Sequence, residues 1–183
     1  MSNDENYLII RGEETTSGGK LWIKDLRKPN SPLVAILNNY DSDTFVLSIK
    51  GDKIYFHTNL NAPNGRIVVA DIKNPTPEHW KDLIAETQNV LTPVVAGKYI
   101  LAHYMKDAIS QVKQYDFEGK LIRDIKLPAL GTVTLNSAKE EESESYFSFE
   151  NFYTPSSIYK LHLDKGDTEL YWAPKIDFNP NDF

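Results

Sequence analysis

A short strand-like phrase recurs four times along this chain at nearly constant spacing. Its copies are residues 21–26, 67–72, 112–117 and 158–163. The fifth positions of these copies are residues 25, 71, 116 and 162, which lie 46, 45 and 46 residues apart. A fixed period of about 40–50 residues built from short strands is typical of the blades of a β-propeller. Because a single blade leaves its faces uncovered, the pattern predicts sheets that pack on neighbouring sheets.

Turn-forming residues divide each of the last three repeats into four strand-like pieces. The expected strands are residues 45–50, 53–60, 66–72 and 80–85, then 90–95, 98–104, 111–117 and 120–127, then 132–136, 144–150, 157–163 and 168–172. The first repeat has only three pieces, residues 7–11, 20–26 and 33–37, and lacks its first strand. The sequence therefore predicts an all-β fold, a β-propeller fragment of about four antiparallel four-stranded blades whose first blade is incomplete.

The repeats also define the expected domain organisation. Residues 1–183 are expected to form a single partial β-propeller domain, with blades at approximately residues 7–37, 45–85, 90–127 and 132–172. The best helical candidate begins with Thr76 as N-cap and Pro77 as the first helical residue. Since the register of the other repeats requires a strand from about Trp80, we expect at most one helical turn there.

The composition excludes several classes of function. The chain has 26 acidic and 20 basic residues, a net charge of −6, and such a field repels the phosphate backbone of nucleic acids. It has no cysteine, which excludes disulfides, thiol catalysis and cysteine-based zinc sites. No apolar run approaches the roughly 20 residues that a membrane span needs. Neither nucleic acid nor a membrane is therefore expected as a partner, and the cellular compartment stays open.

The fifth position of the repeated phrase carries an aspartate in three of the four copies. Asp25, Asp71 and Asp116 each end a strand just before a turn, where a short carboxylate can accept a backbone N–H of the turn. His162 occupies this position in the last copy. Because repeated residues usually do repeated structural work, we interpret the three aspartates as turn caps rather than catalytic groups.

One short motif offers an enzymatic alternative. Asp41, Asp43 and Thr44 fit the DxDxT pattern of phosphatases that use an aspartyl nucleophile. That chemistry would need a buried parallel strand before the first aspartate, whereas Asn38 and Asn39 precede this motif by only a few positions. A polar loop between two blades is the interpretation that fits the antiparallel pattern better.

No other pattern identifies a catalytic centre. The serine-hydrolase motif Gly-x-Ser-x-Gly does not occur, and no Gly-rich loop opens a helix as a phosphate-binding loop would. His57 and His103 are expected on opposite sides of their sheets, since they are one register position apart in matching strands. The acidic run at residues 139–144 is interpreted as a solvated turn, or as a contribution to the field at one mouth of the propeller. No catalytic, cofactor-binding or metal-binding residue is assigned, and no cofactor is expected.

An ordered set of segments resembles the prolyl oligopeptidase (prolyl endopeptidase) family. Residues 58–66 (TNLNAPNGR) look like that family's loop between the second and third strands of a blade, and residues 104–108 (YMKDA) resemble its Tyr-Leu-Lys-Asp segment one blade later. Further resemblances lie at residues 119–123, 127–133 and 148–159. The matches run in order from about Tyr7, and they fall in the C-terminal part of the family's N-terminal seven-bladed propeller.

The resemblance implies a non-catalytic role for this chain. Members of the family carry a propeller that caps an α/β-hydrolase domain with a Ser-Asp-His triad. This chain would then be a propeller fragment of a serine endopeptidase, without peptidase activity alone. In the parent protein it would gate the access of peptide substrates to the hydrolase domain, and its first strands (residues 45–49, 90–95 and 132–136) would border the central tunnel. Such a parent is expected to be soluble, and either cytoplasmic or periplasmic.

A free-standing β-propeller-like interaction scaffold, which binds a protein or ligand through its loops, is the alternative function. A hydrolase domain in the parent reading frame would favour the peptidase interpretation. In either case, uncovered blade faces at the two ends and the open sheet edge of the first repeat predict a further property. We expect the fragment to associate with itself or to close its four repeats into a smaller ring.

Overall fold

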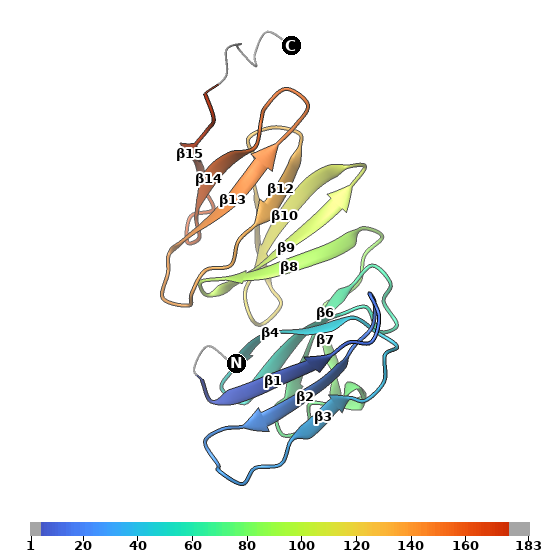
Figure 1. Cartoon of the computed structure of the whole chain (residues 1–183). Helices are drawn as coiled ribbons and strands as arrows, with labels where there is room; N and C mark the ends of the chain where they lie inside the picture. Colours follow the sequence, from blue (N-terminus) through green and yellow to red (C-terminus); the bar gives the residue numbers. More distant parts are fainter. Residues whose placement is uncertain (1–4, 176–183) are drawn as a thin grey trace. The chain divides into compact units, whose positions relative to one another are not determined.

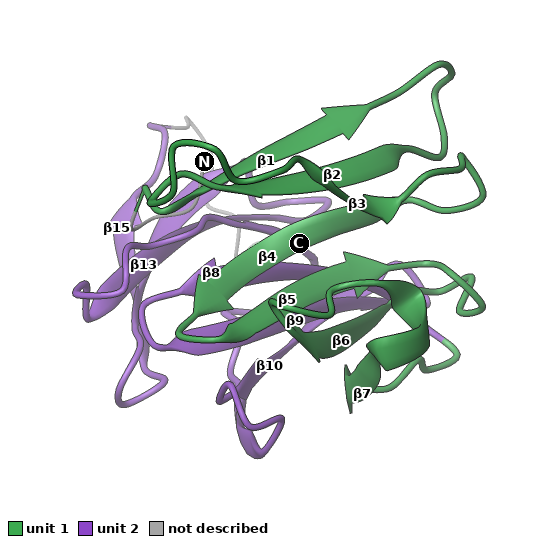
Figure 2. Ribbon diagram, turned by 90° about the horizontal axis from the view of Figure 1, so that it is seen from below, with its two compact units in different colours: residues 1–88 green, residues 89–183 purple. Residues whose placement is uncertain are grey.

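The computed structural model describes residues 5–175, which form 15 β-strands and one short 3-10 turn (Figure 1). The strands make four separate antiparallel sheets, and each sheet is a simple meander of consecutive strands. The chain divides into two compact units, Met1–Gln88 and Asn89–Phe183, which Figure 2 shows in different colours. Within residues 5–175, no helix has the length and apolar character needed to cross a membrane.

The first unit contains a three-stranded and a four-stranded sheet. The first sheet has the strands β1 (Tyr7–Gly12), β2 (Lys20–Asp25) and β3 (Val34–Leu37). The second has β4 (Thr44–Lys50), β5 (Lys53–Thr58), β6 (Arg66–Asp71) and β7 (Lys81–Ile84). Among residues 5–175, the first sheet has no strand that corresponds to β4, as the sequence predicts.

The second unit contains two four-stranded sheets. The third sheet of the chain has β8 (Val90–Ala96), β9 (Tyr99–Lys106), β10 (Ile109–Tyr115) and β11 (Leu121–Ile125). The fourth has β12 (Thr132–Leu135), β13 (Glu144–Glu150), β14 (Ser157–His162) and β15 (Thr168–Trp172). The repeated phrase falls on β2, β6, β10 and β14, which occupy equivalent places in the four sheets.

Two strand boundaries differ from the expected ones for identifiable reasons. The strand expected to reach residue 60 ends at Thr58, whose hydroxyl accepts the backbone N–H of Leu60 and turns the chain. The hairpin between β9 and β10 is tighter than expected. Asp107 and Ala108 both have positive φ (50° and 61°) and form a two-residue turn, although neither is the glycine or asparagine that usually announces one.

The helical candidate is a single 3-10 turn, Pro77–His79. Thr76 is the N-cap residue, but its hydroxyl bonds the Glu78 carboxylate rather than a backbone N–H. The indole Nε1 of Trp80 donates to the Pro75 carbonyl (2.8 Å), and the ring stacks on Phe56 at 5.0 Å. This packing fixes the chain before β7 begins at Lys81.

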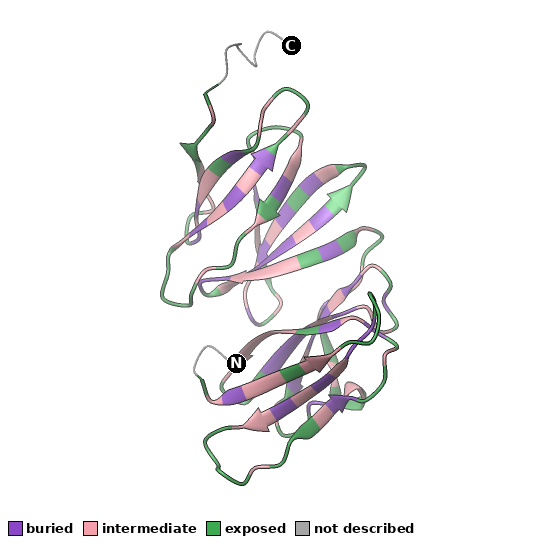
Figure 3. Cartoon of the chain, viewed as in Figure 1, coloured by how far each residue is buried: buried purple, intermediate pink, exposed green. Residues whose placement is uncertain are grey.

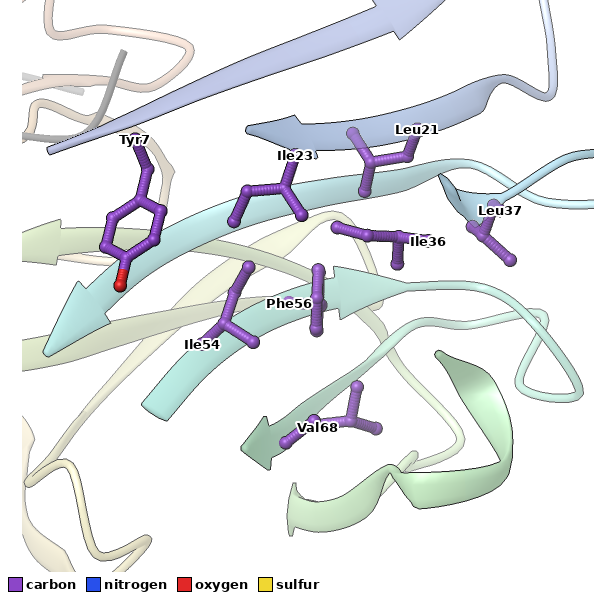
Figure 4. Packing of buried hydrophobic residues seen from close by; sticks show 9 residues of the cluster. Tyr7, Leu21, Ile23, Ile36, Leu37, Ile54, Phe56 and Val68 are labelled. Atoms are coloured by element: carbon purple, nitrogen blue, oxygen red, sulfur yellow. The ribbon is translucent and has the colours of Figure 1, made fainter. Parts of the chain in front are cut away.

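The core of the first unit lies between its two sheets. Its nine buried residues are Tyr7, Leu21, Ile23, Ile36 and Leu37 from the first sheet and Ile54, Phe56, Val68 and Ala70 from the second. Figure 4 shows these side chains meeting between the strands. Complete burial of one large apolar side chain contributes about 1.5–3 kcal/mol, so this layer is what holds the two sheets together.

The second unit repeats this arrangement with larger aromatic groups. Its core contains Leu101 and Val112 from the third sheet and Phe147, Phe149 and Leu161 from the fourth. Tyr159 packs on Phe147 (5.5 Å, stacked) and on Phe149 (6.0 Å, edge to face). Burial alternates along β13, as the banding in Figure 3 shows, because successive side chains of a strand point to opposite faces.

Candidate functional site

The first strands of the three complete sheets are edge strands. β4, β8 and β12 each end the strand order of their sheet, and these are the strands expected to border a tunnel. Their exposed side chains include Phe45, Val90 and Thr134. In the first sheet no strand among the described residues takes this position, and β1 is the edge strand there.

The edge of β8 is protected by proline. Ala96 and Tyr99 flank the two-residue turn of the β8–β9 hairpin and therefore form a hydrogen-bonded pair. Because hydrogen-bonded and non-hydrogen-bonded pairs alternate along an antiparallel ladder, the pair Pro93–Ala102, three positions further on, has no backbone hydrogen bonds. The ring nitrogen of Pro93 therefore faces away from β9, which is where a proline is tolerated in a strand. At the end of the same strand, Ala138 forms a parallel bridge with Ala96 and bonds Val95 and Gly97.

The DxDxT segment forms a hydrogen-bonded loop between the first two sheets. The Asp43 carboxylate accepts the backbone N–H of Gly18 (2.9 Å) and the guanidinium of Arg11 (3.1 Å), and the Asp43 N–H donates to the Asn59 side chain (2.7 Å). Behind it, the hydroxyls of Ser42, Thr44 and Thr58 form a buried chain with links of 3.1 and 2.7 Å. The interpretation as a polar connecting loop is confirmed.

Arg11 belongs to this cluster and was not identified from the sequence. Its guanidinium also pairs with Glu13 and lies 4.2 Å from the centre of the Phe45 ring. Its Nε is buried and has no hydrogen-bond partner among residues 5–175. Arg11 thus joins the end of β1 to the beginning of β4, and no local pattern in the sequence signals this contact.

The three repeated aspartates cap their turns, as expected. Asp25 and Asp71 each accept the backbone N–H two residues later (3.0 and 2.8 Å), and Asp116 accepts two such groups, at 3.0 and 2.8 Å. The hydrogen bond from the Arg27 side chain lowers the pKa of Asp25 to about 2. The carboxylates of all three aspartates are thus used in hydrogen bonds that hold the turns. His162 takes no capping role and contacts Glu144 and Glu169.

A serine and a histidine come together in the third sheet. The His103 Nε2 lies 2.8 Å from the Ser110 hydroxyl, which also accepts the backbone N–H of Val133 (2.9 Å). Burial lowers the pKa of His103 in favour of the neutral form. Ser110 is 4% exposed, so the pair joins the third and fourth sheets and offers no accessible nucleophile.

Both units carry a groove between their loops. The groove of the first unit, about 810 Å³, lies between the β2–β3 loop and the beginning of the β6–β7 loop and contains Tyr7, Ile23, Arg27 and Lys73. That of the second unit, about 740 Å³, lies among the β9–β10, β11–β12 and β13–β14 loops. Leu130 and Phe152 extend into solvent beside it. Within residues 5–175, no three His, Asp or Glu side chains are grouped as a metal site would require.

The chain matches a family model described as prolyl oligopeptidase, N-terminal beta-propeller domain, over residues 1–174. Curated prolyl endopeptidases of Elizabethkingia miricola and Elizabethkingia meningoseptica are 43% and 42% identical to it over 183 residues. These alignments cover all of this chain and 26% of each relative. The chain thus spans about a quarter of the length of the curated relatives that it matches.

Solved structures agree in fold. A chain from a structural and mechanistic study of two prolyl endopeptidases superposes with a TM-score of 0.89 and 26% identity, covering 98% of this chain and 26% of that one. Prolyl oligopeptidase B from Galerina marginata gives a TM-score of 0.85 at 20% identity, covering 99% and 27%. The prediction of an all-β propeller fragment is confirmed. The chain therefore belongs to the prolyl oligopeptidase family and matches its N-terminal β-propeller domain.

Proposed function

We propose that this chain is the gating part of a serine peptidase and has no catalytic role itself. Its four sheets would be consecutive blades of one partial propeller domain, residues 1–183. The propeller would restrict which peptides reach a hydrolase domain elsewhere in the parent chain. The observation that carries this proposal is the match of residues 1–174 to the family's propeller domain, together with 43% identity to a prolyl endopeptidase over the whole chain.

The chemistry of the described residues supports a non-catalytic role. The carboxylates of Asp25, Asp71 and Asp116 are used in turn caps, and Asp43 is used in the loop between sheets. The Ser110 hydroxyl that contacts His103 is buried. Bond cleavage is therefore assigned to the hydrolase domain of the parent, whose substrates would be peptides.

Gating would come from the first strands. β4, β8 and β12 carry the half-exposed and exposed side chains that an incoming peptide would pass, and they have no neighbouring strand on their outer edge among residues 5–175. The sheets that carry these edge strands are each held by their own hydrogen-bond ladder, so the opening between the edges would resist widening. A gate of this kind selects by peptide size rather than by sequence.

The proposal is tested in the full-length parent enzyme with substrates of two sizes. Thr134→Trp adds bulk at an exposed position of β12, and Leu121→Trp adds bulk at an exposed position of the fourth-strand β11 as the matched control. We expect Thr134→Trp to lower kcat/KM for a long peptide by about tenfold more than for a chromogenic prolyl dipeptide. The control should leave this ratio unchanged.

Two results would overturn the proposal. If Thr134→Trp reduces turnover of both substrates equally, the first strands do not select by size. If the 183-residue chain alone hydrolyses prolyl peptides, the assignment of catalysis to another domain is wrong.

A further inference from the structure

The sequence contains a single Asn-Gly pair, Asn64–Gly65, in the loop between β5 and β6. Asparagine loses its side-chain amide most readily before glycine, which has no side chain to shield its backbone nitrogen. In this reaction the Gly65 nitrogen gives up its proton and attacks Cγ of Asn64. The new C–N bond closes a succinimide ring, and the Cγ–Nδ2 bond breaks and releases ammonia. Water then opens the ring to aspartate or isoaspartate, so the reaction needs no oxidant or cofactor.

The folded loop withholds both reacting groups. The backbone N–H of Gly65 is buried and donates to the Ala62 carbonyl at 2.7 Å, so it exchanges its proton slowly. The side-chain Nδ2 of Asn64 donates to the Thr87 carbonyl at 3.0 Å, which holds the amide in place. Deamidation of Asn64 therefore requires the loop to open.

Asn64 fastens this loop to the segment between β7 and β8. The Glu86 carboxylate accepts the backbone N–H of Asn64 at 2.6 Å, and the next residue, Thr87, accepts its side chain. A hydrogen bond to an ionised acceptor is stronger than one between neutral groups. The backbone and the side chain of Asn64 thus bind two consecutive residues of the segment that leads to β8.

Deamidation would remove this connection. An aspartate at position 64 has no Nδ2 donor, so its carboxylate would face the Thr87 carbonyl, which is also an acceptor. The new carboxylate would also lie close to that of Glu86, and two like charges at short range repel each other. Isoaspartate, with its extra backbone methylene, would in addition displace the Gly65 N–H. The closed loop is therefore favoured before the reaction and disfavoured after it.

We propose that Asn64 is a modification site that reacts only while the β5–β6 loop is open, and that its deamidation keeps the loop open. A converted chain does not return to the closed form, so the converted fraction records how long the loop has spent open. Conversion also releases the segment that leads from β7 to β8.

Peptide mass mapping of the 183-residue chain tests the first part, with samples kept folded or in urea. Asn136 is the internal reference, because Asn136 and Ser137 are exposed and an Asn-Ser pair also deamidates. The rate at Asn64 relative to that at Asn136 should be about tenfold or more lower in the folded chain than in urea. An equal ratio would show that the loop gives no protection. If Asn64 does not convert even in urea, it is not a modification site.

Hydrogen exchange at Gly65 gives an independent check on the need for opening. Exchange of its N–H and conversion of Asn64 would depend on the same open state, so the fold should slow both by factors that agree within about threefold. If Gly65 exchanges freely while Asn64 stays protected, a requirement for loop opening is wrong.

Glu86→Ala tests the fastening itself. Loss of the acceptor for the Asn64 N–H should raise conversion in the folded chain by about tenfold. Glu118→Ala removes a glutamate from another exposed loop position and should leave the rate unchanged. Circular dichroism checks that both variants fold; if Glu86→Ala does not, Glu86→Gln, which keeps a weaker acceptor, takes its place with a smaller increase. A folded variant that converts at the wild-type rate would overturn the role of Glu86.

Asn64→Asp carries the product directly and tests the second part. Its Gly65 N–H should exchange about tenfold faster than in the wild type, because the loop stays open for longer. Adding Glu86→Gln should recover part of the protection, since it removes the like charge. If Asn64→Asp exchanges like the wild type, the loop closes again after deamidation and the change is not one-way.

Discussion

The side-chain amide of Gln114 donates a hydrogen bond to the backbone carbonyl of Leu163, 2.6 Å away. This bond crosses between the two sheets of the second unit, and Gln114 is completely buried. Its Oε1 has no hydrogen-bond partner among residues 5–175, so the bond from Nε2 is the polar contact that anchors this side chain. Leu163 in turn donates its N–H to Ser143, which orders the loop before β13.

Replacement of Gln114 should therefore destabilise the second unit. We expect Gln114→Ala to lower the free energy of unfolding by about 2 kcal/mol, since it leaves a cavity and an unpaired carbonyl. Gln114→Leu should cost less, because it fills the volume and removes the unpaired Oε1. Urea titration followed by tryptophan fluorescence measures both. Equal stability of all three proteins would contradict the assigned role of this bond.

Asp43 should matter for stability and Asp41 should not. Asp43→Ala removes the partner of Gly18 and of Arg11, and we expect a loss of about 1–3 kcal/mol. Asp41 is exposed and, among residues 5–175, bonds only the side chain of Asn39, so Asp41→Ala should change the unfolding free energy by less than about 0.5 kcal/mol. Thermal unfolding of both variants tests this difference.

The same two variants test the phosphatase alternative. The wild type should show no turnover of p-nitrophenyl phosphate, with or without magnesium. Turnover that disappears in Asp41→Ala would refute the structural interpretation of this loop.

Stability should fall in mild acid because of His103. Burial holds the pKa of His103 below its unfolded value of about 6.5, so the folded state favours the neutral imidazole. The unfolded state binds a proton first as the pH falls below that value, and stability then decreases until the folded pKa is reached. Urea midpoints at pH 8 and pH 5 measure the decrease.

Removal of the imidazole tests this assignment. His103→Gln should show a smaller decrease between the two pH values than the wild type. An unchanged decrease in His103→Gln would assign the pH dependence to another group.

Two glycines with the same backbone conformation should respond differently to alanine. Gly51 and Gly97 have φ of 57° and 58°, so a side chain at either position costs about 1–2 kcal/mol. A Cβ at Gly51 meets nothing within 4 Å, whereas at Gly97 it would lie 2.7 Å from the Glu142 carbonyl oxygen. Gly97→Ala should therefore be the more destabilising by about 1–3 kcal/mol, as thermal unfolding would show. Equal losses of stability would show that the backbone at Glu142 moves away from the added Cβ without a measurable cost in free energy.

The periodic features of this chain were predictable because they are local and repeated. The repeated phrase predicted an inner strand of each of the four sheets. The aspartates at its fifth position, Asp25, Asp71 and Asp116, predicted the caps of the turns that follow three of these strands. Both follow from residues that are close together along the chain.

The contacts between sheets were not predictable from the sequence. Gln114 lies where the first repeat has the buried Ile23, and its partner Leu163 is 49 positions away. Arg11 reaches Asp43 across 32 positions, and nothing near either residue signals the other. The Ser110–Val133 bond is also non-local, since it links the third and fourth sheets across 23 positions.

Pro93 has a consequence for the behaviour of the chain in a crowded cell. A bare edge strand invites a strand from a foreign polypeptide to extend the ladder, which is how many aggregates begin. A strand that added to the outer edge of β8 would meet the ring of Pro93, which has no N–H to donate. The new hydrogen-bond ladder would therefore end after about one or two bonds. The outer edge of β8 is therefore a poor template for fibril growth.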